Sequence, residues 1–243
     1  FESAEAGYLK LKGADTIALT RELQSHGIRV QGSSIVGMEH HTPGNMRRAI
    51  AHAVAHDADC HQFMLYTPVP GTPLHADMEA QGRMLEGVDL ADIHGQYKFN
   101  FKHEHIERDD SKVWLDWAFQ HDFDVNGPSL FRMMRTMFEG WKRYGADGDA
   151  RVRARFAGEA AKLKQGYGAA LWAMEKYLAA SNESVSERIG DLRRQIEREL
   201  GGLSRIIDHV VGPVLLWSAR RDAAAYPMGR PLEPKTFVDR RNW

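Results

Sequence analysis

The sequence predicts an α/β fold with parallel strands, followed by an all-α C-terminal region. Two apolar runs, at residues 28–37 and 60–67, are each too short for a buried helix and have the length of buried strands. An amphipathic segment of about four helical turns separates them. From residue 111 onward the pattern becomes helical.

The first elements extend this alternation toward the N-terminus. Residues 1–3 have the character of a strand end, and Asp15 caps a predicted helix that Gly27 terminates. The order strand, helix, strand, helix, strand favours an α/β sheet or barrel. Three strands cannot close a barrel of the usual kind, so we expect further strands upstream of Phe1, or an open sheet. The absence of an initiator Met suggests a piece of a longer protein.

The helix between the two apolar runs has clear start signals. Thr42 is a good N-cap, and Pro43 suits the first helical position. Its core-facing stripe consists of Met46, Ala49, Ile50, Ala53 and Val54. We therefore predict a βαβ unit with parallel strands and a right-handed crossover.

A Pro- and Gly-rich stretch follows the second run and ends it. Thr72 or Pro73 caps a short helix that we expect to reach Gln81. The next residues are polar and aromatic without a clear period. We predict three regions: an α/β region with parallel strands over 1–85, an ordered crossover loop over 86–110, and helices with an extended tail over 111–243.

The C-terminal region divides into several predicted helices. Apolar segments occur around residues 114–119 and 130–141, and longer helices are expected over 149–180, 184–200 and 203–220. Ser184 and Glu187 form a capping-box pattern at the start of one of them. Pro213 is expected to kink or bound the last helix, and an extended tail is expected over 225–243.

Composition excludes several classes of partner. A formal charge of -1 gives no electrostatic reason to expect nucleic acid as a partner. No apolar run approaches the roughly 18 residues that a membrane span needs. The single cysteine, Cys60, excludes an internal disulfide and suits a reducing compartment, so we expect a cytoplasmic location.

Ligands of parallel α/β folds bind beyond the carboxyl ends of the strands. Here those ends are Glu2 with Ser3, residues 33–37, and residues 66–68. Gly37 would let a flat ligand group approach the backbone. The proline after the third strand breaks the strand and would leave backbone groups free to bind the polar edge of that ligand. The alternative is that the glycines serve strand packing and the prolines only end a strand.

Several stretches in this region resemble a known family. The residues are Glu2-Ser3, YLKLK at 8–12, GIRVQGSSIVGMEHHTPGNM at 27–46 and, most specifically, FMLYTPVPGTPLHADMEAQGRM at 63–84. They resemble the C-terminal half of the radical S-adenosylmethionine core, in the branch that often carries an N-terminal cobalamin-binding domain. The resemblance implies a partial (β/α)6 barrel whose four-iron four-sulfur cluster is held by a Cys-x3-Cys-x2-Cys loop. That cluster cleaves S-adenosylmethionine reductively to a 5′-deoxyadenosyl radical.

The resemblance also implies roles for individual residues. Glu2 and Ser3 would face the ribose or methionine part of the cofactor, Ser33, Ser34, Ile35 and Gly37 would border the adenosine, and Tyr66, Thr67 and Pro68 would meet the adenine through backbone groups. The departure from the family is the lone Cys60, because such clusters need several thiolates. The cluster ligands, any cobalamin site and the activity would then belong to an intact parent with an N-terminal half, acting on a small-molecule substrate that the resemblance does not identify.

Two other functions compete with this interpretation. His52 and His56 are four residues apart on one helix, and His61, His103 and His105 could join them around a metal, although Ala53 stands where a zincin has its catalytic Glu.

The second competitor is a non-catalytic helical interaction module. The charge-dense helix over 184–200 could pair with another chain, although such charge usually marks a solvated face. The pair His40-His41 lies at the predicted ligand face, where the two side chains could contact a ligand or could simply be exposed loop residues.

Overall fold

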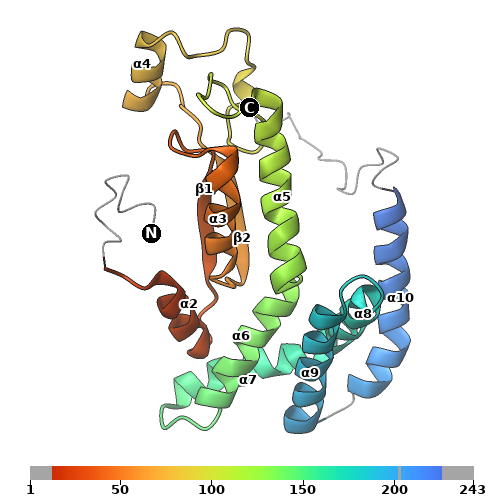
Figure 1. The fold of residues 1–243 in the computed structure, drawn as a ribbon. Helices are drawn as coiled ribbons and strands as arrows, with labels where there is room; N and C mark the ends of the chain where they lie inside the picture. Colours follow the sequence, from red (N-terminus) through yellow and green to blue (C-terminus); the bar gives the residue numbers. More distant parts are fainter. Residues whose placement is uncertain (1–12, 202–203, 226–243) are drawn as a thin grey trace, which may run out of the picture. The chain divides into compact units, whose positions relative to one another are not determined.

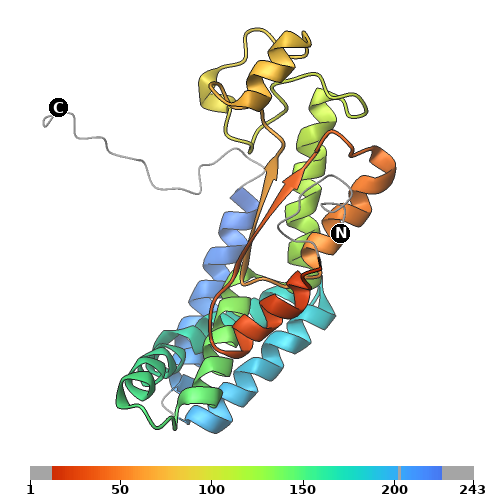
Figure 2. The ribbon, with the colours of Figure 1, turned by 90° about the vertical axis from the view of Figure 1, so that its left-hand side faces the viewer.

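The computed structural model describes residues 13–201 and 204–225, and the chain divides into two compact units, Phe1–Ala160 and Ala161–Trp243 (Figures 1 and 2). The strand end predicted at residues 1–3 and the tail predicted beyond 225 lie outside the described residues. The helices predicted from residue 111 onward are shared between the two units.

The first unit alternates helix and strand and then becomes helical. Its elements are α2 (Thr16–Ser25), β1 (Gln31–Val36), α3 (Pro43–Val54), β2 (Cys60–Leu65), α4 (Pro73–Ala80), the 3-10 helix η2 (Leu90–Asp92), α5 (Arg108–Asn126), α6 (Ser129–Tyr144) and α7 (Ala150–Lys162), which reaches the unit boundary. The prediction that the strand over 28–37 begins at Ile28 is wrong, since Ile28 is exposed and lies before β1. α5 begins at Arg108, three residues earlier than expected.

β1 and β2 form a parallel two-stranded sheet with α3 as the crossover, which confirms the predicted βαβ unit. The register runs from Gln31 opposite Cys60 to Val36 opposite Leu65. Helix therefore dominates the described chain, with a small parallel sheet, in agreement with an α/β class.

The helix starts follow the predicted capping chemistry. Thr42 accepts a hydrogen bond from the Asn45 amide at 3.3 Å, and the Asn45 side chain accepts from the Thr42 amide at 2.8 Å. Asp15 caps α2, and Thr72 caps α4. These local signals are the reason that α2, α3 and α4 start where the sequence predicts.

One face of the sheet carries the core. Ser34 and Val36 point toward α3, and Gly32 lies on the same face, since side chains alternate along a strand. α3 and α5 cover this face, and Figure 1 shows α5 running alongside β2. The buried cluster comprises Val36, Met46, Ile50, Ala53, Val54, Phe63, Leu65, Met78, Phe99, Phe101, Ile106, Leu115 and Ala118.

The segment between α4 and α5 closes the outer edge of β2. The Leu65 amide donates to the Gly95 carbonyl at 2.8 Å, and the Gln96 side chain donates to the Phe63 carbonyl at 2.5 Å. The ring of Phe99 lies fully buried in the core. The predicted ordered crossover loop thus follows a strand edge and supplies core residues.

Two buried ionic groups tie the strands to the helices of the same unit. Asp59, directly before β2, accepts hydrogen bonds from the amide of Val30, directly before β1, at 2.8 Å and from the Thr136 hydroxyl of α6 at 2.6 Å. Arg132 of α6 pairs with Asp122 of α5 at 2.7 Å, with both side chains almost fully buried.

The second unit is helical. It contains the π-helical turn η3 (Leu163–Tyr167), α8 (Gly168–Leu178), α9 (Glu183–Leu200) and α10 (Ser204–Ala225). The predicted single helix over 149–180 is therefore interrupted. The capping box predicted at Ser184 is wrong, because the side chain of Asn182 caps α9 by accepting from the Val185 amide at 3.2 Å. Pro213 lies inside α10 and does not bound it.

No helix in the described part of the chain combines the length and the apolar character needed to cross a membrane.

Candidate functional site

The ends of β1 and β2 lie side by side, and most of the predicted ligand residues lie on β1 or directly after one of the two strands. Ile35 and Val36 end β1, and the amide of Tyr66, just beyond β2, donates to the Val36 carbonyl at 2.8 Å. The two strand ends predicted to share a nucleoside pocket therefore meet at one edge. Glu2 and Ser3, predicted for the same pocket, lie outside the described residues.

The predicted residues of β1 are divided between two faces of the sheet. Ser33 and Ile35 point to the open face, where Ile35 is 49% exposed. Ser34 points toward α3, and its hydroxyl lies 3.0 Å from Nε2 of His61. A ligand on the open face therefore reaches Ser33 and Ile35 but not the Ser34 hydroxyl.

Gly37 has a packing role at the end of β1. Its φ is +75°, and a Cβ at this position would overlap the ring of Phe99. The amides of Gly37 and Met38 both donate to Nδ1 of His41 at 3.1 Å, and His41 is only 3% exposed. The buried imidazole therefore fixes the turn, and its Nδ1 carries no proton.

The residues after β2 are held by the segment that closes its edge. Tyr66 packs edge-on against Phe101 at a ring-centroid distance of 6.0 Å, and the Thr67 hydroxyl donates to the carbonyl two residues earlier at 2.8 Å. The side chain of Asn100 donates to the Pro68 carbonyl at 2.8 Å. The backbone carbonyl of Pro68, predicted to meet a ligand, is thus already engaged.

Asn100 is a buried polar residue that was not predicted from the sequence. It is 1% exposed, and its Oδ1 has no hydrogen-bond partner among the described residues. The sequence held one indication of its role: Asn100 lies between two aromatic residues, Phe99 and Phe101, and an amide side chain buried beside them needs a specific hydrogen-bond partner.

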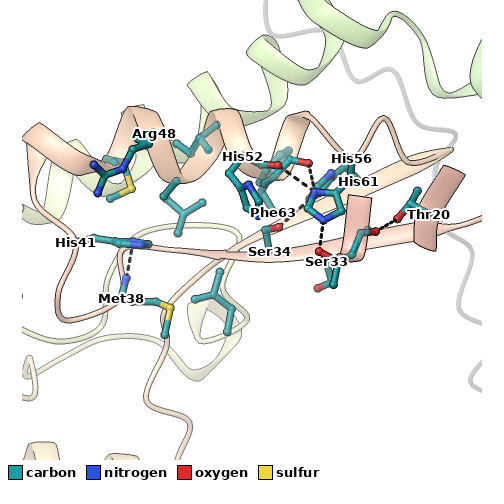
Figure 3. A pocket seen from close by; sticks show the side chains of 18 of the residues that line it. Thr20, Ser33, Ser34, Met38, His41, Arg48, His52, His56, His61 and Phe63 are labelled. Atoms are coloured by element: carbon teal, nitrogen blue, oxygen red, sulfur yellow. Dashed lines mark hydrogen bonds between the residues drawn. The ribbon is translucent and has the colours of Figure 1, made fainter. Parts of the chain in front are cut away.

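A cavity of about 480 Å³ runs along β1. Every residue of β1 lines it, together with one side of α3 and the start of α2. Figure 3 shows its extent, from His41 and Met38 at one end to Thr20 at the other. The cavity is therefore an elongated groove beside a strand edge.

His61 lies in the wall of this groove. Its ring stacks on Phe63 at 4.1 Å, and burial lowers the pKa of His61 to about 4. Its Nδ1 is buried and has no hydrogen-bond partner among the described residues. Gly32 lies against this ring, since a Cβ there would stand 3.1 Å from Nδ1. The neutral imidazole therefore leaves one nitrogen unsatisfied beside a residue without a side chain.

The histidines considered for a metal site do not gather around one point. Nε2 of His56 contacts the Thr16 hydroxyl at 2.8 Å. His103 stacks on Phe99, contacts the Met38 carbonyl at 3.0 Å, and has its pKa lowered by burial. Within residues 13–201 and 204–225, no three His, Cys, Asp or Glu side chains are arranged to hold a metal ion.

The residues of this chain do not fit an iron–sulfur cluster. The single cysteine, Cys60, is partly exposed on β2, and clusters of this kind need several thiolates. The strand tips offer the Ser33 hydroxyl and the exposed side chain of Ile35 on one face. This mixture of a polar and an apolar group suits one side of a nucleoside site.

The chain matches no protein-family model, and no curated protein or solved structure is significantly similar to it.

Proposed function

We propose that this chain is the C-terminal part of a radical S-adenosylmethionine enzyme, and that the tips of β1 and β2 form one side of its nucleoside pocket. The observation that carries the proposal is the hydrogen bond from Tyr66 to Val36, which brings the two strand ends together. The motif over 63–84 supports it from the sequence.

In this proposal the residues of the chain bind and orient the cofactor. Ile35 packs against the nucleoside from the open face, and Ser33 offers it a hydroxyl. Tyr66 and Thr67 complete the same edge beyond β2. When bound in the parent, the cluster and S-adenosylmethionine supply a 5′-deoxyadenosyl radical or a methyl group. No residue of this chain is assigned to the cluster or to cobalamin.

The first experiment is to read the coding sequence upstream of Phe1. The proposal expects a Cys-x3-Cys-x2-Cys loop there, and a start codon immediately before Phe1 would refute it. The parent is then purified anaerobically, and S-adenosylmethionine affinity and 5′-deoxyadenosine release are measured.

Ile35→Asp places a charge on the proposed binding face. We expect it to weaken S-adenosylmethionine binding at least tenfold, because an apolar contact is replaced by a carboxylate that must be desolvated. The matched control is Leu19→Asp, since Leu19 is also exposed (55%) but lies on α2. Equal affinity in both variants would contradict the assignment of Ile35.

A helical interaction module is the second candidate, favoured by one observation in the second unit. α10 exposes Val210, Val214 and Trp217, which recur at helical spacing on one side. If this side binds a partner, Trp217→Lys abolishes the association in sedimentation experiments. The radical-enzyme proposal expects cofactor cleavage to survive that change.

A further inference from the structure

Three hydrogen-bonded side chains join α2 to α6, away from the strand ends. Nε2 of His26, at the end of α2, lies 2.8 Å from the Glu22 carboxylate one turn earlier. Nδ1 of the same ring is hydrogen-bonded to the hydroxyl of Tyr144, the last residue of α6. His26 lies shortly before β1 starts at Gln31, so this triad is at the opposite end of the strand from the candidate nucleoside site.

The directions of the two hydrogen bonds follow from the chemistry of the side chains. A carboxylate only accepts, so the proton of the neutral imidazole is on Nε2 and points to Glu22. Nδ1 is then an acceptor, and the Tyr144 hydroxyl donates to it. A hydroxyl that donates to a base, which is itself oriented by a third group, is the arrangement that activates weak oxygen nucleophiles.

The packing of α2 against α6 holds the triad in place (Figure 1). Gly27 directly follows His26 and has a φ of +71°, and a Cβ there would stand 2.7 Å from Cα of Gly140 in α6. The two backbones therefore meet without intervening side chains. The ring of Phe156 in α7 stacks on the Tyr144 ring at 5.0 Å. The phenol and the imidazole are thus positioned by regular elements, which hold a reactive geometry better than loops do.

The triad can be reached from solvent. The side chains of His26 and Glu22 are 30% and 66% exposed, and Tyr144 is partly exposed. The guanidinium of Arg143 lies 5.8 Å from the centroid of the Tyr144 ring, and its Nη1 donates to the Ser25 hydroxyl at 3.2 Å. A small electrophile can therefore approach the phenol oxygen, and the nearby cation favours the negative charge that develops during attack.

We propose that Tyr144 is a nucleophilic tyrosine that accepts an uncharged acyl group, with His26 as its general base and Glu22 as the residue that positions His26. Oη of Tyr144 bonds to the acyl carbon while its proton passes to Nδ1 of His26. The bond from the acyl carbon to the leaving group then breaks, and the leaving group departs with the electron pair and takes the proton from His26. The products are a tyrosyl ester and the protonated leaving group.

The charges of the site select the class of electrophile. A phosphoryl group on Tyr144 would bring nearly two negative charges close to the Glu22 carboxylate, whereas an acyl group brings none. This inference goes beyond the proposed function and does not depend on it.

N-Acetylimidazole, a reagent that acetylates tyrosine hydroxyls, tests the inference in the 243-residue chain. Mass spectrometry follows the acetylation of each tyrosine, and hydroxylamine confirms the ester. Tyr97 and Tyr177 are internal controls because they are 39% and 37% exposed, more than Tyr144, and Tyr97 has the Lys98 ammonium over its ring but no histidine at its hydroxyl among the described residues. Exposure alone would make Tyr144 the slowest of the three. We expect it to react at least about tenfold faster than both, since a general base contributes roughly 10²–10⁴-fold in enzymes.

Two variants assign the roles within the triad. His26→Gln removes the base and should lower the acetylation rate of Tyr144 to that of Tyr97, with unchanged rates at Tyr97 and Tyr177 as evidence that the variant is folded. Glu22→Gln keeps an acceptor for Nε2 but removes the charge that stabilises the protonated imidazole, so the rate at Tyr144 should fall by a smaller factor, about threefold. The ¹⁵N shifts of His26 should show an unprotonated Nδ1 in the unmodified chain.

Several results would overturn the inference. They are a rate at Tyr144 no higher than at Tyr97, an unchanged Tyr144 rate in His26→Gln, and a proton on Nδ1 of His26. Acetyl phosphate can transfer either of its two groups, and a phosphoryl group on Tyr144 instead of the expected acetyl group would overturn the acyl class. None of these measurements involves S-adenosylmethionine, so failure here is distinct from failure of the proposed function.

Discussion

Replacing Arg132 by Met tests the buried ion pair that joins α5 to α6. Arg132 is 2% exposed, and its guanidinium donates to Asp122 at 2.7 and 3.1 Å and to the Ala58 carbonyl at 2.7 Å. The variant leaves a buried carboxylate and a buried carbonyl without these donors. Removing one partner of such a pair costs about 3–5 kcal/mol of unfolding free energy.

The matched control lies on the same helix. Lys142 pairs with Glu139 at 2.7 Å, but both side chains are about a third or more exposed, so Lys142→Met should cost no more than about 1 kcal/mol. Native-state hydrogen exchange at the amides of α5 and β2 measures the first unit by itself, which a urea curve for a chain of two units would not.

A double variant gives the sharper comparison. Asp122→Leu combined with Arg132→Met removes both charges and should recover much of the lost stability, because a buried pair and an apolar replacement are often similar in free energy. A loss below about 1 kcal/mol in Arg132→Met would refute the reasoning, since the pair would then behave like one at the surface.

Three further predictions concern single positions in the first unit. The unfolding free energy of the first unit should fall as the pH is lowered from about 6.5 to about 4, because burial lowers the pKa of His61 to about 4 in the folded state and the unfolded chain therefore binds a proton that the folded chain does not. His61→Gln should flatten that part of the stability profile measured by native-state hydrogen exchange. Gly37→Ala should cost about 1–3 kcal/mol more than Gly71→Ala by the same exchange measurement, since both glycines have positive φ but only at Gly37 would the Cβ overlap a ring, that of Phe99. Thr42→Ala should cost about 1 kcal/mol by the same measurement, and Thr42→Ser should cost much less because it keeps the cap.

Local chemistry made the helix starts predictable. Asp15, Thr42 and Thr72 each supply a side-chain oxygen to a backbone amide within three residues, and such contacts depend on nearby sequence alone. Where two residues compete for one cap, the same reasoning failed. Asn182 took the position expected for Ser184, because an Asn side chain two residues earlier serves equally well.

The candidate site was predictable only in part. The two apolar runs predicted a βαβ unit in which the ends of β1 and β2 are neighbours. They did not predict that Ser33 and Ser34 lie on opposite faces of the sheet with only one face buried, because that depends on the register of the strand relative to the core. Hydrogen bonds between residues far apart in the sequence could not be predicted from the residue pattern. The contacts of Asn100 with Pro68 and of Asp59 with Thr136 join positions more than thirty residues apart, and no local rule connects them.

Asp59 sets a lower limit on the length of chain that can fold as the first unit. Its carboxylate stands at the entrance to β2, yet one of its donors, Thr136, belongs to a helix far beyond the strands. A polypeptide cut at residue 110 would lack this hydroxyl, and the Asp59 carboxylate would lose one of its hydrogen-bond donors. A transplant of the βαβ unit into another protein should therefore supply a replacement donor for Asp59.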